Sequence, residues 1–148
     1  TKIDNLIKRL GDITVRSNLV DYTFRNSDSL LSKQQKLLSK FNNETDLFFT
    51  ISQGVYETTF VLSDKLKESI HEIFEGEKLI SYINELSSIT IKLPKENIEL
   101  PGLYYFIFRK LAWDGINVLE VISTSNEFTI ILKDQDVDRA FTAIKKLK

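Results

Sequence analysis

The stretch "ISQGVYETTFVLSD", residues 51–64, returns near the end of the chain as "ISTSNEFTIILKD", residues 122–134. In each copy, β-branched and aromatic residues flank a short polar segment, a pattern that predicts an antiparallel hairpin. The second copy is shorter by one letter, so we expect a turn that is one position shorter there. The two turns are expected at Gln53-Gly54 and at Ser125-Asn126.

The segments around the hairpins repeat in the same order. A strand and an apolar helix come before each hairpin, and an amphipathic helix with apolar residues at helical spacing follows it. This order predicts the α+β class, with two ferredoxin-like βαββαβ units in tandem, each an antiparallel sheet with helices on one face. The expected segments are a first short helix at 2–10, strands within 12–24 and 78–94, and helices at 27–41, 64–76, 100–115 and 135–148.

We predict three parts of the chain from this repeat. They are an N-terminal helix and spare strand in residues 1–17, a first unit in 18–87 and a second unit in 88–148. The second unit ends on its second helix, so its fourth strand is missing from the C-terminus. An open sheet edge invites pairing with another strand. We therefore expect that edge to be filled either by "DITVRS", residues 12–17, or by a partner chain.

Composition argues against several classes of function. The chain has 20 basic and 21 acidic residues, a net charge of −1, which gives no electrostatic reason to bind nucleic acid or an anionic membrane. It has no Cys and one His, so we expect no disulfide, no metal site and no Ser-His catalytic centre. That residue, His71, is interpreted as a surface side chain paired with the acidic residues around it. No residues resemble a catalytic constellation, and we expect neither enzyme activity nor a cofactor.

The ends of the chain and its hydropathy bear on where the protein works. No apolar run is long enough to span a membrane and the N-terminus is not a signal peptide, so we expect a cytoplasmic protein. The chain begins with Thr1 and contains no Met, which is compatible with a trimmed chain and with a piece of a longer protein. A kinase part or a DNA-binding part would then lie outside this sequence.

Three features of the second half occur together. Pro101-Gly102 starts a helix, Gly115-Ile116-Asn117 ends it, and the hairpin and second helix follow at a short distance. With these features, residues 88–147 resemble an ACT domain, the small regulatory module of aspartokinases and phosphoglycerate dehydrogenases. The first half resembles the family more weakly, through its order of elements and its hairpin. The whole chain is similar to the regulatory end of aspartokinases and to stand-alone ACT proteins.

The resemblance implies a site for an amino acid or a similar small effector at an interface between ACT units. At a helix start, free N–H groups attract a carboxylate, and a glycine there lets the ligand approach the backbone closely. Glu99 stands where the family usually has Asp or Asn, so the identity of the ligand stays open. Carried over by position, the ligand-binding residues are Glu99, Leu100, Gly102, Leu103, Asn117 and Val118.

Each of these features also has a plain structural interpretation. Pro101-Gly102 can be an ordinary helix start and Gly115 an ordinary C-cap. Asn117 can be a turn residue, and Glu99 a solvated loop carboxylate. When the first copy is matched to the second by the constant shift that places Ile51 on Ile122, Leu31 falls on Gly102, so we expect that copy to be mainly structural.

The helix expected over residues 100–115 carries more aromatic residues than one core-facing stripe needs. Tyr105, Phe106 and Trp113 form a second stripe, for which we expect contact with another unit, either the first half of the same chain or a second copy in a homodimer. The chain is thus predicted to be a regulatory amino-acid-binding module that acts through ACT-domain assembly. The alternatives are an assembly module without a ligand, the regulatory fragment of an aspartokinase-like enzyme, and part of a transcriptional regulator.

Overall fold

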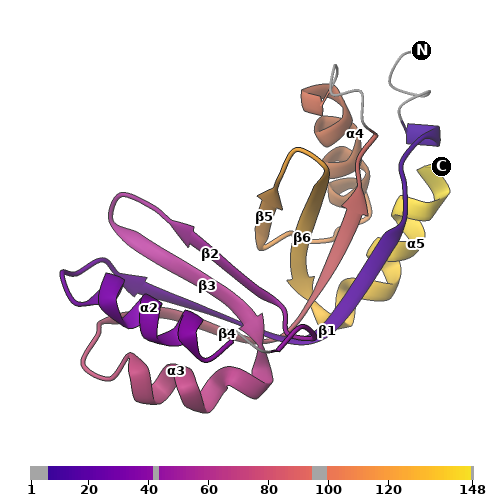
Figure 1. Cartoon of the computed structure of the whole chain (residues 1–148). Coiled ribbons are helices and arrows are strands. Elements are labelled where there is room, and N and C mark those ends of the chain that lie inside the picture. The colour runs from indigo at the N-terminus through magenta and orange to yellow at the C-terminus, as the bar shows by residue number, and fades with distance from the viewer. Residues whose placement is uncertain (1–6, 42–43, 95–99, 148) are drawn as a thin grey trace. The chain divides into compact units, whose positions relative to one another are not determined.

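The computed structural model describes residues 7–41, 44–94 and 100–147. Its helices and strands follow the predicted order (Figure 1). Residues 2–6 of the predicted first helix lie outside the described residues, and Ile7 and Lys8 are helical. The elements are β1 (Ile13–Arg25), α2 (Leu30–Ser39), β2 (Phe49–Gln53), β3 (Glu57–Ser63), η1 (Asp64–Leu66), α3 (Lys67–Ile73), β4 (Leu79–Lys92), α4 (Leu100–Trp113), β5 (Glu120–Ser123), β6 (Glu127–Lys133), η2 (Asp134–Asp136) and α5 (Val137–Leu147).

The chain divides into two compact units. Unit 1 consists of Thr1–Arg16 and Ser87–Lys148, and unit 2 consists of Ser17–Leu86. The long strands β1 and β4 therefore each contribute one end to each unit. Asn18 and Glu85, close to these crossings, have positive φ angles of 60° and 55°. Because side chains rarely adopt positive φ, each long strand departs from regular β geometry near the point where it changes unit.

Unit 2 is an antiparallel sheet with the strand order β2-β3-β1-β4 and two helices, α2 and α3, on one face. Along β1 and β3, alternate side chains point to that face because the side-chain period of a strand is two residues. Aromatic rings fill much of the space: the ring of Phe74 on the helix side lies 5.1 Å from the rings of both Phe24 and Phe60. The buried core residues are Val20, Tyr22, Phe24, Leu30, Leu37, Phe60, Leu62, Ile70 and Phe74.

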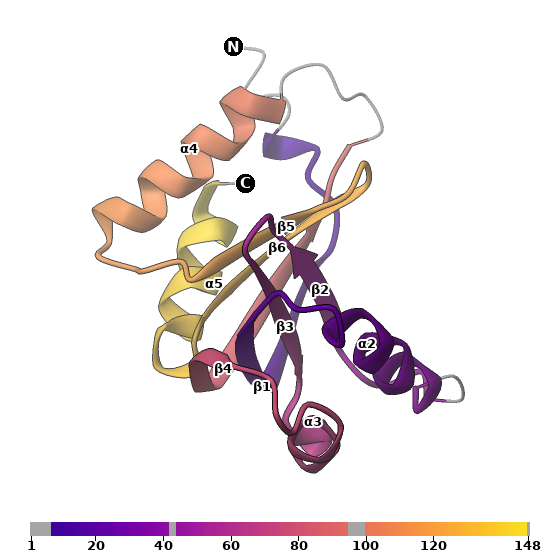
Figure 2. The same ribbon diagram turned by 90° about the vertical axis from the view of Figure 1, so that its left-hand side faces the viewer.

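Unit 1 has the strand order β1-β4-β6-β5, with α4 and α5 on one face (Figure 2). The start of β1 is its fourth strand: the Lys92 N–H donates to the Asp12 carbonyl at 3.0 Å, and the Gly11 N–H donates to the Lys92 carbonyl at 2.8 Å. This is one of the two outcomes expected for the open edge. The core is mainly aliphatic, built from residues such as Ile89, Ile91, Leu103, Ile107, Leu111, Ile130, Leu132 and Ile144 around Phe128.

The two hairpins have the same length, so the predicted one-position gap is wrong. Ile51 pairs with Phe60 in unit 2, and Val121 pairs with Ile130 across an equally long connection in unit 1. Both turns are closed in the same way, by a bond from Gly54 to the Glu57 carbonyl and by one from Thr124 to the Glu127 carbonyl. The two "IS" pairs are therefore not equivalent in the structure, because strand register is set by the pairing partner rather than by the identity of the residues.

Two threonine pairs mark the same place in both sheets. The side-chain oxygens of Thr23 and Thr59 lie 2.8 Å apart in unit 2, and those of Thr90 and Thr129 lie 2.7 Å apart in unit 1. The paired threonines are separated by 36 residues of chain in unit 2 and by 39 residues in unit 1. A constant shift cannot relate the copies, because the connection between the first strand and the hairpin is longer in unit 1.

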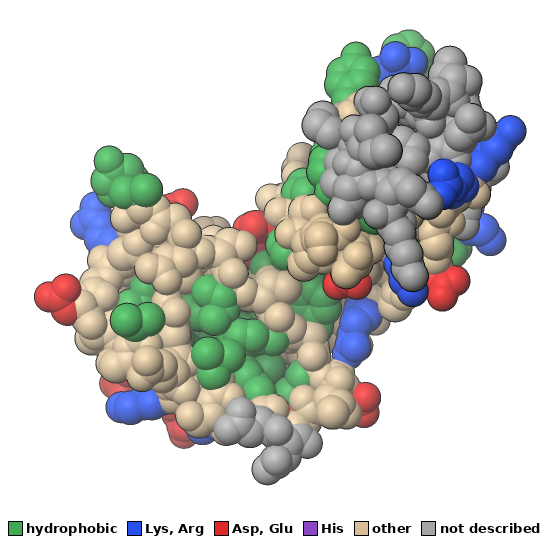
Figure 3. Space-filling view, turned by 45° about the horizontal axis from the view of Figure 1, so that its top comes forward, with side chains coloured by type: hydrophobic (Ala, Val, Ile, Leu, Met, Phe, Trp, Pro, Cys, Tyr) green, Lys and Arg blue, Asp and Glu red, His purple; other side chains and the backbone are tan. Residues whose placement is uncertain are grey.

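None of the described helices is both long enough and apolar enough to cross a membrane. The longest, α4, has 14 residues, whereas a span needs about 20. Charged side chains of both signs are spread over the face of the molecule seen in Figure 3, which fits the balanced composition.

Candidate functional site

The start of α4 is where the sequence places the main part of the effector site. Glu99 lies outside the described residues, and the helix begins at Leu100. Gly102, the third residue, is half-buried. Leu103 is completely buried in the core of unit 1, so its side chain cannot contact a ligand and only its main chain remains available. The first four N–H positions of a helix have no partner within the helix, and Gly102 and Leu103 occupy two of them.

The far end of α4 explains the Gly-Ile-Asn sequence in structural terms. Gly115 has a φ of 73°, and its N–H bonds to the Ala112 carbonyl while the Ile116 N–H bonds to the Leu111 carbonyl. This pair of bonds is a Schellman motif, which needs a residue with positive φ and is usually completed by an apolar contact. Ile116 makes that contact by packing in the core with Leu111. The interpretation of Gly115 as a C-cap is therefore confirmed.

Asn117 and Val118 follow this cap and lie at the opposite end of α4 from Gly102. Asn117 is exposed, and Val118 is half-buried against the core of unit 1. At 1.5 Å per residue, the helix carries the chain roughly 16 Å between Gly102 and Trp113. One small ligand cannot contact both ends within a single unit. The predicted residues therefore lie in two separate groups in unit 1, one at each end of α4.

A tyrosine that the sequence analysis did not single out lies beside the helix start. The hydroxyl groups of Tyr104 and Ser123 are 2.6 Å apart, joining the first turn of α4 to the end of β5. The ring of Tyr104 packs on Phe128, with the ring centres 5.0 Å apart. Sequence alone could not choose Tyr104 over its neighbour Tyr105, since only the helical phase decides which ring faces the sheet.

The corresponding region of unit 2 holds a carboxylate of the protein itself. Glu77, in the turn between α3 and β4, accepts hydrogen bonds from Ser27 Oγ (2.5 Å), Ser29 Oγ (2.6 Å) and Lys33 Nζ (2.6 Å). Its side chain is only 4% exposed. Burial by itself raises the pKa of Glu77, but the hydrogen bonds from Lys33, Ser27 and Ser29 outweigh it and lower that pKa to about 2.

The match between the two helix starts differs from the one counted in the sequence. Leu30 and Gln34 are buried residues of α2, and Leu103 and Ile107 are buried residues of α4 with the same spacing. Ser29 therefore stands at the place of Gly102, and the assignment of Leu31 to that place is wrong. The constant shift failed because α4 has 14 residues and α2 only 10, while the core-facing side chains decide how the helices correspond.

His71 was expected to pair with acidic neighbours on its own helix. In the structure its Nε2 atom lies 3.0 Å from the hydroxyl oxygen of Tyr22, and the two rings meet edge to face. Burial, together with the nearby Tyr82 and Glu68, raises the pKa of Tyr22. A hydroxyl that stays protonated can donate to a neutral imidazole, so the pair fits a structural contact. Within the described part of the chain, no group of three His, Asp or Glu residues is placed to hold a metal ion.

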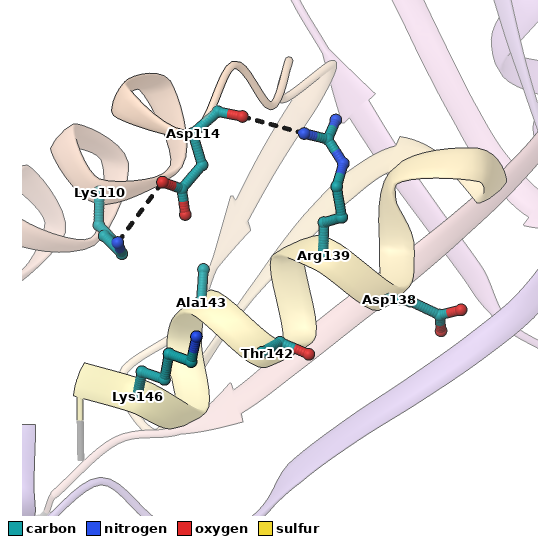
Figure 4. A pocket seen from close by; sticks show the side chains of 7 residues that line it. All are labelled: Lys110, Asp114, Asp138, Arg139, Thr142, Ala143 and Lys146. Carbon is teal, nitrogen blue, oxygen red and sulfur yellow. Dashed lines mark hydrogen bonds and ion pairs between the residues drawn. The ribbon is translucent and has the colours of Figure 1, made fainter.

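An open groove of about 510 Å³ runs between α4 and α5 (Figure 4). Arg139 on α5 donates to the main-chain carbonyl of Asp114 at 3.0 Å and to the Asp136 carboxylate at 2.9 Å. Lys110 and the Asp114 carboxylate are 3.4 Å apart. These four residues therefore bond to one another. Their contacts hold the end of α4 against α5.

The outer side of α4 exposes large aromatic side chains. Tyr105 is 64% exposed and Trp113 86%, whereas Phe106 is partly buried against the core. A groove of about 550 Å³ beside them is lined by Phe106, Arg109, Lys110, Trp113 and Leu147. Exposed apolar groups also occur in unit 2, where Val55 and Tyr56 occupy the turn between β2 and β3.

Comparisons with known proteins were made by sequence and by structure. No protein family and no curated protein sequence matches the chain. Similar solved structures include the regulatory subunit of aspartate kinase from Thermus thermophilus in its ligand-free form, with a TM-score of 0.74 and 13% identity over 94% of this chain and 99% of that one. The aspartokinase alpha and beta subunits match with a TM-score of 0.74 and 14% identity, over 96% of this chain and 97% of theirs.

A third similar structure is a complete enzyme with small molecules bound. It is Escherichia coli aspartokinase III in complex with lysine and aspartate, with a TM-score of 0.64 and 12% identity. The match covers 93% of this chain but 32% of that one. At such low identity the likeness establishes the fold. The chain has the fold of the regulatory part of aspartate kinases, two ACT-like units in tandem.

Proposed function

We propose that the chain is a regulatory module that binds a small carboxylate-bearing effector, most simply an amino acid, at the start of α4. The observation that carries this proposal is the first turn of α4, in which Gly102 has no side chain and Leu103 turns its own side chain into the core. A carboxylate placed there would meet main-chain N–H groups at the positive end of the helix dipole. The complex of aspartokinase III with lysine and aspartate supports an amino acid as the effector class.

The proposed site needs a second copy of the chain to complete it. Asn117 and Val118 lie too far from Gly102 to share a ligand with it, so a second copy of the chain would supply them. The exposed rings of Tyr105 and Trp113, with Phe106, support such a homodimer, because large apolar groups on a helix surface usually mark an interface. Effector binding would then favour one arrangement of the two copies over another. We place this module in the cytoplasm.

The test is a thermal-shift screen of the twenty amino acids. A ligand present at a hundred times its Kd stabilises the folded protein by about 2.7 kcal/mol, which is easily measured. Gly102→Val should abolish the response, since a branched side chain would stand where the carboxylate approaches the backbone. Ala112→Val is the matched control on the exposed surface near the other end of the same helix, and it should keep the full response. A response that survives Gly102→Val would place the site elsewhere.

A second candidate is an assembly module that binds no effector. The exposure of Trp113 favours it as well, because dimerisation through α4 does not require a ligand. Trp113→Lys should convert a dimer into a monomer in analytical ultracentrifugation, while Val55→Lys in unit 2, equally exposed, should not. A dimer that responds to none of the amino acids would favour assembly alone.

A further inference from the structure

We propose that Ser27, Ser29 and Lys33 of unit 2 form a carboxylate-binding site that Glu77 keeps filled from within the chain. Both carboxylate oxygens are used: Ser27 bonds to Oε1, and Ser29 and Lys33 bond to Oε2. Two hydroxyl donors and one ammonium group are the set that recognises a free carboxylate. The Glu77 side chain is only 4% exposed, whereas Ser27 and Ser29 are exposed, so the site lies at the surface with its donors covering the carboxylate.

The two units differ at the position that carries this carboxylate. The Arg25 N–H donates to the Lys78 carbonyl in unit 2, as the Lys92 N–H donates to the Asp12 carbonyl in unit 1. Arg25 and Lys92 correspond, because each is the second residue after the paired threonine of its strand, Thr23 or Thr90. The carbonyl partner Lys78 therefore corresponds to Asp12, and Glu77 corresponds to Gly11. Unit 1 has no side chain at the position from which unit 2 supplies its internal carboxylate.

This difference makes unit 2 the closed counterpart of unit 1. In unit 2 the place next to the helix start is taken by Glu77, so an effector carboxylate would have to displace it from three hydrogen bonds. In unit 1, Gly11 has no side chain to fill this place, so a carboxylate from another molecule would fill it. This statement rests on the function proposed above. Glu77 also lines a groove of about 230 Å³ with Phe74 and Gly76.

The experiment removes the internal carboxylate and offers another one. Glu77→Ala should lower the Tm by roughly 5 °C, because Lys33 and two hydroxyl groups lose this acceptor, although Lys33 keeps its bond to the Glu75 carbonyl. About 100 mM sodium acetate should then raise its Tm in a saturable way relative to the same concentration of sodium chloride. The wild-type chain and the neighbouring exposed control Glu75→Ala should show no such difference between the two salts. Adding Lys33→Ala to Glu77→Ala should remove the acetate response.

The proposal is overturned if acetate and chloride act alike on Glu77→Ala, or if the wild-type chain responds as strongly. Should this variant not fold, the wild-type chain still decides, because the Glu77 carboxyl must remain ionised at about pH 4 in a carbon-detected NMR titration. Protonation at that pH would mean that the three donors do not hold it. Failure of the proposed function would appear separately, as a wild-type chain that ignores amino acids while Glu77→Ala still responds to acetate.

Discussion

The two units share one fold but close their first helix differently. In unit 2, β4 follows α3 through a turn whose Glu77 reaches back to Ser27, Ser29 and Lys33. In unit 1, the fourth strand is the start of β1, and Gly11 stands at the matching place. The difference shows that two copies of a duplicated fold can differ in whether a side chain of their own places a carboxylate beside the first helix.

The cores differ as well. Unit 2 stacks aromatic rings between its sheet and two short helices, whereas unit 1 packs Ile and Leu side chains under the longer helix α4. An aromatic ring covers more surface per residue, so it suits helices of 10 and 7 residues that offer few core positions. Longer helices bring more aliphatic side chains to the sheet. The comparison can be tested at matched positions.

The largest effects are expected at the centre of the two cores. Phe60 and Ile130 are equivalent residues of the third strands, and both are fully buried. Phe60→Ala should lower the free energy of unfolding by about 4 kcal/mol and Ile130→Ala by about 3 kcal/mol, because each leaves a cavity. Urea denaturation measures both. A loss below about 1 kcal/mol at either position would mean that the two cores do not contribute comparably to the free energy of unfolding.

The next effect concerns Glu77 and its dependence on pH. Glu77→Gln should lower the free energy of unfolding by about 2 kcal/mol at neutral pH, because the ion pair with Lys33 is lost. Glu77 has a folded pKa of about 2, below the ordinary value of 4.5, so its ionised form stabilises the fold above about pH 5. This contribution should decline as the pH falls and vanish near pH 2. Chemical denaturation of both proteins across this range would show it, and a constant difference would contradict the assignment.

A smaller effect is expected at two glycines, one in the turn after α3 in unit 2 and one in the C-terminal cap of α4 in unit 1. Gly76 in unit 2 and Gly115 in unit 1 have φ angles of 88° and 73°, and nothing lies within 4 Å of a Cβ atom added at either place. Alanine would therefore fit without a clash, yet would be strained by the left-handed backbone. Each substitution should cost about 1 kcal/mol in thermal unfolding. Unequal costs would show that one of the two glycines contributes more to stability than the other.

The smallest effect is expected at Arg139. This side chain is more than half exposed and caps the main chain at the end of α4, so Arg139→Ala should lower the free energy of unfolding by about 0.5 kcal/mol. Ser69 occupies the matching place in unit 2, since it follows Asp64 at the same spacing at which Arg139 follows Asp134. Ser69→Ala should leave stability unchanged. Urea titrations of the two variants, run side by side, compare the two helix ends directly.

Much of the fold could be predicted because the deciding signals are local. The apolar spacing of α5, the turn residues of both hairpins and the Gly115 cap each depend on neighbours within a few positions. The fold class followed from the order of these elements. The residue-by-residue match of the first copy to the second was wrong, because it assumed a constant shift along the chain. The true match follows from strand pairing with β3 and β6 and from which side chains of α2 and α4 are buried.

The candidate site was predictable only in part. The helix start at Gly102 carries a local signal, but its separation from Asn117 follows from the length of α4. The contact between Tyr104 and Ser123 spans 19 residues, and those from Ser27 and Ser29 to Glu77 are longer still. No local pattern indicates such pairs, since each residue alone is an ordinary loop or helix residue.

By itself, the sequence determined which segments are helices and strands, that they occur twice, and that a glycine lies near the start of one helix. These properties depend on backbone preferences and on the periodicity of apolar residues, which act over a few residues. The tertiary structure decided that the start of β1 completes unit 1 and that Glu77, rather than Gly11, brings a carboxylate to a helix start. Strand pairing and side-chain hydrogen bonds join residues that are distant in the chain, and only their spatial arrangement reveals them.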